Sequence, residues 1–345
     1  MVPKLTMQEI ARLAGVSLAT VSRAVHNPEL LRPHTRQRIL QVMAEHNYVY
    51  NAAAGDLSRQ RSTVIGVTVP TNRNPIFAAS TFAIEEQAQE MGYSILLANT
   101  QYSPEVESQL LQGFLERRVA GIILTGFSID RKAQVQDLVD AGIHCLVIWE
   151  QLKDSGLSYV GFDNHGAARA MTAHLAGLGH RRIGLIIGPY SKLGRVQKRL
   201  DGYRSALREA GIGFDPELVL ENAPVLEDGK ESMHHLMSLD DPPTAVFAAS
   251  DILAIGALSA AKEMGLNVPA DVSIAGFDDN DFAAYCDPPL TTVRVPSHEI
   301  GRLAARHLIE TIESGAAQIR QYSLRTDLIV RGSCAPPRAR QNTSG

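Results

Sequence analysis

Polar and aromatic side chains follow several short apolar runs of the chain, at positions where a small ligand could bind. The chain's one tryptophan, Trp149, precedes Glu150, and this pair could stack a ring on the C–H face of a sugar while the carboxylate binds hydroxyls. Asp163, Ser250 and Asp278 each follow another apolar run. Because ligands of parallel α/β sheets bind at the carboxyl ends of strands, we expect these side chains to face one site. A lone tryptophan is, however, more often a core residue.

Basic side chains suited to an anion lie in and just after a predicted loop, at Lys192, Arg195 and Arg199. An arginine fork binds a carboxylate through two parallel hydrogen bonds, so this group favours a ligand that carries a carboxylate. The alternative for Lys192 and Arg195 is that both are solvated surface charges.

The sequence lacks the motifs of several enzyme classes. It contains no Gly-x-Ser-x-Gly nucleophile elbow and no Walker loop. His234 and His235 are adjacent on a predicted helix and point two ways, which does not suit one metal ion. The acidic run Asp278–Asp281 lacks the glycine and the distal glutamate of a calcium-binding loop. We therefore expect no catalytic residue, no metal and no cofactor, and a protein that is not an enzyme.

Charge is distributed unevenly along the 345 residues, whose net charge is −4. Residues 1–61 carry eight Lys/Arg against four Asp/Glu, whereas the remainder carries 25 against 33. A short basic head on an acidic body indicates that the head meets a polyanion.

Helix signals in the head predict three short helices. The run Thr6-Met7-Gln8-Glu9 fits a capping box that opens a helix from about Met7 to Ala14, with Leu13 on its buried face. A second helix is expected from Leu18 to about His26, and a third from about His34 to His46. Two short helices joined through a glycine-containing turn make a helix-turn-helix.

The exposed face of the second predicted helix carries residue types that read DNA. The N-terminal part of a recognition helix contacts base edges in the major groove. Arg23 could pair with guanine, and Leu18 could meet a thymine methyl group. The predicted DNA-binding residues of the head are Thr6, Ser17, Leu18, Ala19, Thr20, Ser22, Arg23, Asn27, Thr35, Arg36 and Tyr48. The alternative is a plain three-helix bundle with a solvated basic face.

The head closely resembles that of the lactose-repressor (LacI/GalR) family. The resemblance rests on the run Thr6–Asn27, with its strings Ala14-Gly15-Val16-Ser17 and Thr20-Val21-Ser22-Arg23, and on Asn47–Asn51. It extends to about Gly332. It implies binding to double-stranded operator DNA.

In that family, the segment that matches residues 51–61 forms a hinge helix on operator DNA. A leucine at the position of Leu57 wedges into the minor groove and bends the duplex, which exchanges unstacking energy for a larger wrapped surface. This chain departs from the family at Gly55 and Asp56, and glycine costs a helix about 1 kcal/mol relative to alanine. We expect a hinge helix that forms less readily; a flexible tether is the alternative. The resemblance adds three DNA contacts, Asn51, Ala54 and Leu57.

Short apolar runs alternate with amphipathic segments from Thr63 onward, which predicts a doubly wound α/β body. The resemblance implies two lobes of the periplasmic-binding-protein type, joined by three crossings near residues 162, 291 and 323. The predicted organisation is a helix-turn-helix head (1–50), a hinge helix or linker (51–62), a body for effector binding and dimerisation (63–334) and a disordered tail (335–345). Within the body, the N-lobe spans about 63–162 and 292–322, and the C-lobe about 163–291 and 323–334.

The resemblance also implies which residues bind the effector. Arg199 and Asp278 match positions at which family members hold their effectors, and Asp163 matches another acid beside the pocket. Many sugar-binding relatives have asparagine where this chain has Ser250. The predicted effector-binding residues are Ile76, Phe77, Trp149, Glu150, Asp163, Arg195, Arg199, Ser250 and Asp278.

Three features predict where the protein works and how it assembles. Its three cysteines are an odd number without short spacing, which indicates a reducing compartment. The first residues contain no apolar secretory core, and no apolar run approaches the roughly 18 residues of a membrane helix. We expect a cytoplasmic protein, associated with the nucleoid through DNA and not with a membrane. The tail has no leucine heptad, so a homodimer is expected.

These features together predict a transcriptional repressor of a carbohydrate-utilisation operon, released from a pseudo-palindromic operator by a small sugar or sugar acid. The segments Ala98–Glu107 and Gly161–Asn164 are most similar to gluconate-utilisation repressors, which favours a gluconate-like effector. The alternatives are a cytosolic sugar-binding sensor without regulated DNA binding and a corepressor-type regulator of a non-sugar metabolite.

Overall fold

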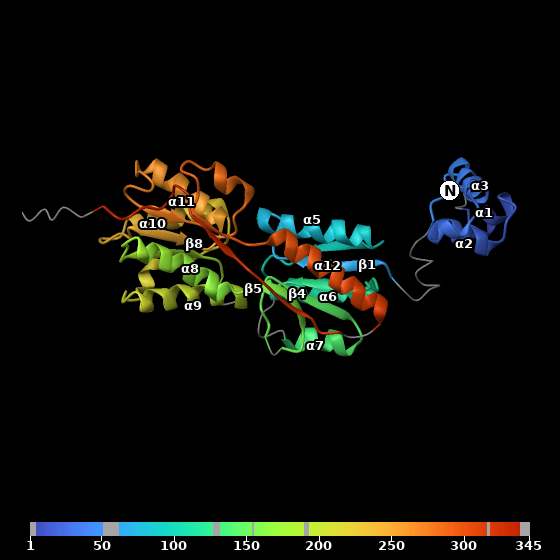
Figure 1. Cartoon of the computed structure of the whole chain (residues 1–345), viewed down its shortest axis with the longest axis horizontal. Helices are drawn as coiled ribbons and strands as arrows, with labels where there is room; N and C mark the ends of the chain where they lie inside the picture. The colour runs from blue at the N-terminus through green and yellow to red at the C-terminus, as the bar shows by residue number, and fades with distance from the viewer. Residues whose placement is uncertain are drawn as a thin grey trace, which may run out of the picture. The chain divides into compact units, whose positions relative to one another are not determined.

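The chain divides into two compact units, residues 1–62 and 63–345, which we call the head and the body (Figure 1). The structure is a computed structural model, and it describes residues 5–50, 62–126, 132–153, 155–189, 193–315 and 318–338. None of the helices within these residues is long and apolar enough to cross a membrane.

The head contains the three predicted helices, α1 (Met7–Leu13), α2 (Leu18–His26) and α3 (Pro33–Glu45), with a short 3-10 turn at Pro28–Leu30. The predicted capping box is confirmed, because the Thr6 N–H donates to Glu9 Oε2 at 2.6 Å and the Glu9 N–H donates to Thr6 Oγ1 at 3.3 Å. The hydrogen bonds that the Thr6 N–H and the Thr6 hydroxyl donate to the Glu9 carboxylate lower the pKa of Glu9. Ser17 caps α2 by accepting a hydrogen bond from the Thr20 N–H at 3.2 Å.

The three helices of the head bury one small apolar cluster. Ile10, Val21 and Ile39, one from each helix, are fully buried. The prediction that Leu13 faces this core is wrong, since its side chain is 42% exposed and Ala11 is buried instead. The helix α1 is only two turns long, and its packing against α2 selects the face that carries Ile10, Ala11 and Ala14.

The N-lobe is a six-stranded parallel sheet with the order β11-β5-β4-β3-β1-β2. Apolar clusters place α5 and α12 on one face of this sheet and α6 and α7 on the other. Strands buried on both faces have near-continuous apolar sequences, which is why most of them could be predicted. The strands are β1 (Val64–Val69), β2 (Ser94–Asn99), β3 (Gly121–Thr125), β4 (His144–Ile148), β5 (Ser158–Phe162) and β11 (Gln321–Leu324); the helices are α5 (Pro75–Glu90), α6 (Pro104–Glu116), α7 (Lys132–Asp140) and α12 (Ser297–Ser314).

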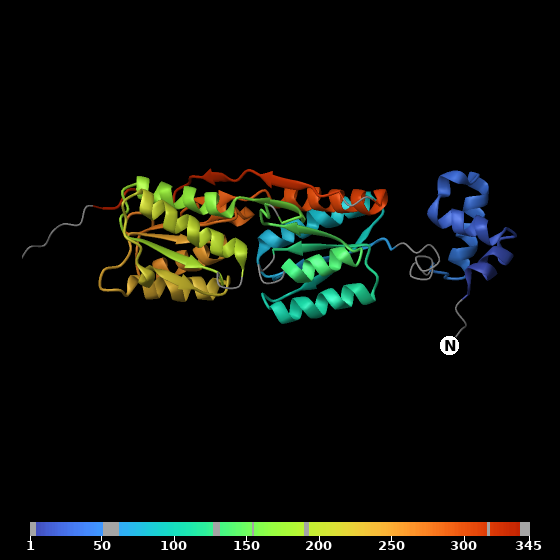
Figure 2. The same cartoon turned by 90° about the horizontal axis from the view of Figure 1, so that it is seen from below.

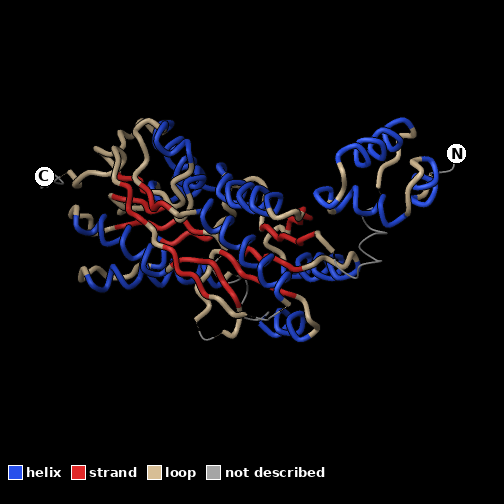
Figure 3. The backbone as a smooth tube through the Cα atoms, turned by 45° about the vertical axis from the view of Figure 1, so that its right-hand side comes forward, coloured by secondary structure: helices blue, strands red, loops and turns tan. Residues whose placement is uncertain are grey.

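The C-lobe repeats this plan with a four-stranded parallel sheet in the order β7-β6-β8-β9. The helices α8 and α9 cover one face, and α10 and α11 cover the other. Figure 3 shows helices on both sides of the red strands of the body. The strands are β6 (Ile183–Ile187), β7 (Val219–Glu221), β8 (Ala245–Ala248) and β9 (Ser273–Ala275); the helices are α8 (Asn164–Gly177), α9 (Gly194–Glu209), α10 (Leu226–Met237) and α11 (Asp251–Glu263), with 3-10 turns at Pro216–Leu218 and Asp281–Tyr285. The predicted fold class, a helix-turn-helix head with a two-lobed α/β body, is confirmed.

Three crossovers join the lobes, close to residues 162, 291 and 323. The first leads from β5 into α8, and the second contains β10 (Thr292–Arg294) and leads into α12. The third connects β11 to β12 (Asp327–Ile329), and in Figure 2 this segment runs along both lobes. The second and third crossovers pair with each other, because β10 and β12 are antiparallel.

The C-terminal segment is ordered beyond the point at which disorder was predicted. The Ala335 N–H donates to Ser273 Oγ at 3.0 Å, and the Ala335 carbonyl oxygen lies 3.0 Å from His180 Nε2. Arg338 pairs with Asp271 at 2.7 Å. The prediction of a disordered tail is therefore wrong for residues 335–338, because these hydrogen bonds and this ion pair hold them against the C-lobe. Residues 339–345 lie outside the described part of the chain.

The helices α5 and α12 approach each other closely at Gly301. A Cβ atom at this position would lie 2.2 Å from the Ser80 carbonyl oxygen of α5. Only glycine allows this distance without a shift of the backbone, so the helix pair depends on the absence of a side chain at residue 301.

We predict that Gly301→Ala lowers the free energy of unfolding of the body by about 1–3 kcal/mol, the usual cost of overpacking. Gly177→Ala is the matched control, because Gly177 is the last residue of α8 and no atom lies within 4 Å of a Cβ built there. Urea unfolding of both variants checks the prediction. Equal stability of the two variants would contradict it.

Candidate functional site

A cavity with a volume of about 50 Å³ lies between the two lobes, where loops follow the carboxyl ends of strands from both sheets. Seven of the nine predicted effector-binding residues line it: Ile76, Phe77, Trp149, Arg195, Arg199, Ser250 and Asp278. Asn74 and Tyr102 from the N-lobe and Leu193, Pro224 and Leu253 from the C-lobe also line it, together with Gly188, Pro189, Val196 and Ala249.

Arg199 is held in place by residues of the C-lobe. Its Nε–H donates to Asn164 Oδ1 at 2.9 Å, and its Nη1–H donates to the Ala249 carbonyl at 2.8 Å. Its guanidinium carbon lies 3.8 Å from the centre of the Phe277 ring, a distance that suits a cation–π contact. Burial lowers the pKa of Arg199 to about 10, although the charge of Asp278 acts in the opposite direction. The group therefore remains a cation at neutral pH.

Arg195 is also buried, with 3% of its surface exposed. Its backbone N–H donates to Glu150 Oε1 at 2.9 Å, but its side chain makes one long hydrogen bond among the described residues, from Nη1 to the Thr125 carbonyl at 3.5 Å. The guanidinium lies against Gly126, where a Cβ would come within 1.8 Å of Nη1. A guanidinium carries five N–H donors, so most of those of Arg195 have no acceptor in the part of the chain that the structure describes.

Asp278 supplies the negative charge of the cavity. Ser250 Oγ donates to its Oδ2 at 3.1 Å, and Asn74 Nδ2 donates to Ser250 Oγ at 3.3 Å, which links the two lobes. Burial raises the pKa of Asp278 to about 6, although the charge of Arg199 and the bonds from Ser250 and Asn74 lower it. Asp278 is therefore mostly ionised at pH 7, and two guanidinium groups beside one carboxylate leave the cavity net positive.

Aromatic rings form the N-lobe wall of the cavity. Phe77 and Trp149 pack edge to face with their centroids 5.4 Å apart. Trp149 is 1% exposed and also packs against Phe162, so it belongs to the core as well as to the cavity wall. Its indole Nε1 has no hydrogen-bond partner within the described residues. Burial raises the pKa of Tyr102, another wall residue, to about 12, so its hydroxyl stays protonated.

Two predicted effector-binding residues do not line the cavity. Glu150 is buried behind it, where its carboxylate binds the backbone N–H of Arg195 at the start of α9. Asp163 is exposed and caps α8 by accepting a hydrogen bond from the Gly166 N–H at 2.9 Å. The next residue, Asn164, faces inward instead and joins Arg199 to the Trp149 carbonyl.

The predicted set of effector-binding residues omits three residues that shape the cavity, Asn74, Tyr102 and Asn164. Asn74 could have been found, because it caps α5 directly after the first strand and precedes Pro75. Asn164 follows β5 in the same way. Tyr102 gave no such signal, since it is placed by a loop in which Gln101 and Tyr102 both have positive φ.

The head presents the predicted DNA-reading residues on the surface of α2 and beside it. Leu18, Ala19 and Arg23 are exposed, and Leu18 is an exposed large apolar side chain on the head. Thr6 and Ser17 use their hydroxyls as helix caps. Asn27 and Arg36 are exposed, whereas Thr20, Ser22, Thr35 and Tyr48 are half-buried.

Some predicted features fall outside the described residues. These are the hinge residues Asn51, Ala54, Gly55, Asp56 and Leu57, and Lys192. Within the described part of the chain, no group of three or more His, Cys, Asp or Glu side chains could hold a metal ion.

Comparisons with known proteins match both units of the chain. Residues 6–51 match the model of the bacterial regulatory proteins of the lacI family, and residues 172–334 match a periplasmic binding protein-like domain. The transcriptional repressor CytR of Escherichia coli is 35% identical over 95% of this chain and 96% of its own length.

Solved structures agree with the sequence matches. A lac repressor dimer bound to operator and the anti-inducer ONPF has a TM-score of 0.83 at 27% identity, covering 96% of this chain and 99% of that one. A complex of the transcriptional regulator CelR with cellobiose has a TM-score of 0.71 at 31% identity, covering 95% and 99%. The matches to both units and to relatives along the whole chain agree on the role: a DNA-binding transcriptional repressor with an effector-binding domain, not an enzyme. The chain therefore belongs to the lacI family of bacterial regulatory proteins.

Proposed function

We propose that a small polyhydroxylated anion, a sugar acid of the gluconate class, releases this repressor from a pseudo-palindromic operator. The repressor acts as a homodimer in the cytoplasm and controls a carbohydrate-utilisation operon. The observation that carries the choice of ligand is the buried Arg195 guanidinium. It lines the cavity with most of its hydrogen-bond donors unused by the described residues.

A carboxylate would compensate Arg195 better than a neutral sugar. A buried charge is costly unless it is paired, and an arginine–carboxylate pair can form two parallel hydrogen bonds. Asp278 does not bind Arg195 directly among the described residues: its carboxylate accepts a hydrogen bond from Ser250, and the charge of Arg195 acts on it only from a distance. The net positive cavity favours an anion for the same reason.

The remaining walls suit a chain of hydroxyl groups. Asp278, Ser250 and Asn74 offer acceptors and donors along one side, and Phe77 offers an apolar surface along another. This combination fits a hydroxylated carbon chain, whose C–H face is apolar and whose edges bind polar groups. The similarity of Ala98–Glu107 and Gly161–Asn164 to gluconate-utilisation repressors supports the same ligand class.

DNA reading is assigned to α2, with Arg23 on guanine and Leu18 and Ala19 on thymine methyl groups. The hinge contacts of Asn51, Ala54 and Leu57 belong to the same proposal. Two heads of a homodimer would each read one half-site, and ligand-induced movement of the lobes would weaken the complex. Typical coupling free energies between two sites of about 1–3 kcal/mol are enough for such control.

We predict that Arg195→Met weakens gluconate binding at least about tenfold, because charge-assisted hydrogen bonds contribute roughly 1.5–3 kcal/mol. The free energy of unfolding without ligand should stay constant or rise, since the variant removes a poorly compensated buried charge. Calorimetric titration and urea unfolding measure the two quantities. Arg208→Met is the control, because Arg208 is an exposed arginine of the same helix. Unchanged gluconate affinity in Arg195→Met would rule out the proposed ligand contact.

We predict that Arg23→Ala weakens binding to the chain's own operator by about 10- to 100-fold, since a bidentate contact with guanine contributes about 1–3 kcal/mol. Arg12→Ala serves as the control, because Arg12 is an exposed arginine of α1. Binding to a labelled duplex and to a scrambled duplex at one fixed salt concentration separates base reading from phosphate attraction. An equal loss on both duplexes would show that Arg23 contacts phosphate and not a base.

A further inference from the structure

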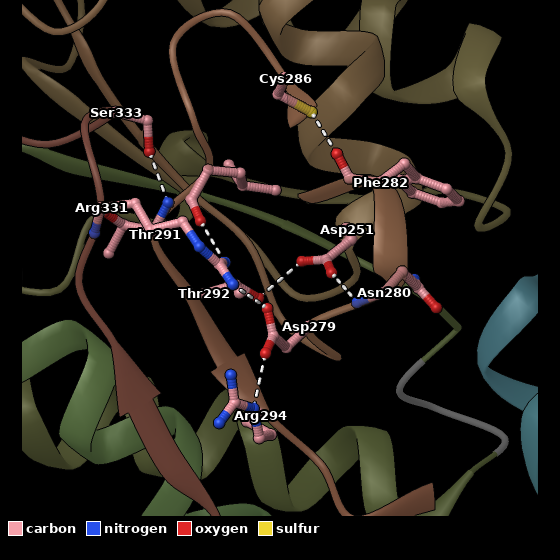
Figure 4. A network of polar contacts seen from close by, with 11 residues as sticks. Asp251, Asp279, Asn280, Phe282, Cys286, Thr291, Thr292, Arg294, Arg331 and Ser333 are labelled. Carbon is pink, nitrogen blue, oxygen red and sulfur yellow. Dashed lines mark hydrogen bonds and ion pairs between the residues drawn. The ribbon is translucent and has the colours of Figure 1, made fainter. Parts of the chain in front are cut away.

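Two residues that line the cavity are each followed by an aspartate whose carboxylate points elsewhere. Ser250 precedes Asp251, and Asp278 precedes Asp279. Asp251 accepts hydrogen bonds from Thr292 Oγ1 at 2.6 Å and from the backbone N–H of Asn280 at 2.8 Å. Its carboxylate therefore ties the start of α11 to β10 of the second crossover (Figure 4).

Asp279 binds both of the crossovers that lie beside it. Its Oδ2 accepts a hydrogen bond from Arg294 Nε at 2.7 Å, and its Oδ1 accepts one from Arg331 Nη2 at 2.7 Å. Arg294 ends β10 in the second crossover, and Arg331 follows β12 in the third. Figure 4 shows the Asp279 carboxylate between the two arginines. Arg331 also donates to the Leu290 carbonyl at 2.8 Å, so the two crossovers are bound to each other as well.

The backbone at this point is constrained from both sides. Asp278 and Asp279 have φ values of 125° and 56°, which are unfavourable for residues other than glycine and persist only where the surroundings hold them. The Asp278 N–H donates to the Val293 carbonyl at 2.9 Å, and the Val295 N–H donates to the Asp278 carbonyl at 3.3 Å. A displacement of the Asp278 backbone would therefore displace Asp279 and the second crossover together.

We propose that Asp279 is a positioning residue that transmits occupancy of the cavity to the crossovers. It does not line the cavity; its side chain is only 6% exposed, and its carboxylate holds the second and third crossovers in one position relative to Asp278. A ligand that binds Asp278 acts on those crossovers through Asp279, and the crossovers set how the two lobes are joined. The inference rests on the proposed function to the extent that Asp278 contacts the effector.

The test uses the full-length chain and the Asp279→Asn variant, which keeps the side-chain volume and removes the charge. The operator dissociation constant is measured without ligand and with saturating gluconate. The value with gluconate divided by the value without it reports the coupling between the cavity and DNA binding. In Asp279→Asn we expect this ratio to fall about tenfold, within the range reported for residues that lie between two coupled sites. Ligand-free operator affinity should change at least about threefold, because the crossovers are no longer held in one position.

Asp271→Asn is the matched control. It removes an aspartate–arginine pair of the same 2.7 Å length in the same lobe, between Asp271 and Arg338, away from the crossovers. Both the ratio and the ligand-free affinity should stay at their wild-type values in this variant. The double variant Asp279→Asn/Arg331→Gln should lose no more coupling than Asp279→Asn alone, because both changes break one contact network.

The outcomes separate positioning from simple stabilisation. If Asp279→Asn lowers only the melting temperature and leaves both the ratio and the ligand-free affinity unchanged, the inference is overturned. If that variant does not fold, Arg294→Gln removes one half-exposed partner of Asp279 and should reduce the ratio in the same direction. If gluconate leaves the wild-type complex intact, the proposed ligand class fails, and the ligand-free operator affinity of the variants still decides the role of Asp279.

Discussion

Two guanidinium groups, those of Arg195 and Arg199, are buried between the lobes, and their burial constrains the side chains that surround the cavity. A buried cation must be compensated by hydrogen bonds or by an opposite charge, or the fold loses stability. The compensation of Arg199 crosses from one lobe to the other, because Asn164 accepts from Arg199 and donates to the Trp149 carbonyl at the end of β4. The contact between the lobes and the polarity of the cavity therefore depend on the same few side chains. Arg195 is compensated less completely, and this difference between the two arginines gives the cavity its preference for an anion.

The elements that carry the cavity could be predicted because their signals are local. Parallel strands buried on both faces have continuous apolar sequences, and the helices between them show a period of 3.6 residues. The capping box at Thr6 and Glu9 and the cap at Ser17 depend on residues three apart, and both are present. The carboxyl ends of parallel strands meet at one edge of a sheet, so strand order did not need to be known to place seven of nine predicted residues around one cavity.

Side-chain direction at the ends of those strands could not be predicted in the same way. Asp163 and Asn164 are adjacent at the start of α8, and which of them faces inward depends on the angle at which the helix leaves β5; the exposed one caps the helix, and the buried one binds Arg199. Glu150 was predicted to bind the effector. Its carboxylate instead lies behind the cavity wall, because it accepts a hydrogen bond from an N–H group at the start of α9 that has no partner within the helix. Ala335 belongs to a proline-rich segment that resembles a disordered tail, and partners more than 60 residues away order it. Each difference arises from a contact between residues distant in sequence.

The placement of two aspartates directly after two cavity residues has a physical cause. At both positions the two neighbouring side chains face different surroundings: the first lines the cavity, and the carboxylate of the second binds a crossover residue. Polar residues at the second position satisfy the crossovers' own polar groups, which would otherwise be buried without partners. Asp251 shows how strongly buried crossover groups need a partner. Burial and the nearby charge of Asp278 raise its pKa, but the hydrogen bonds from Thr292 and Asn280 hold its carboxylate in place. A ligand can shift an equilibrium only through contacts that differ between two states. In this body the groups that line the cavity and the groups that hold the crossovers are neighbours on one constrained backbone, which is the route by which we propose that the two are coupled.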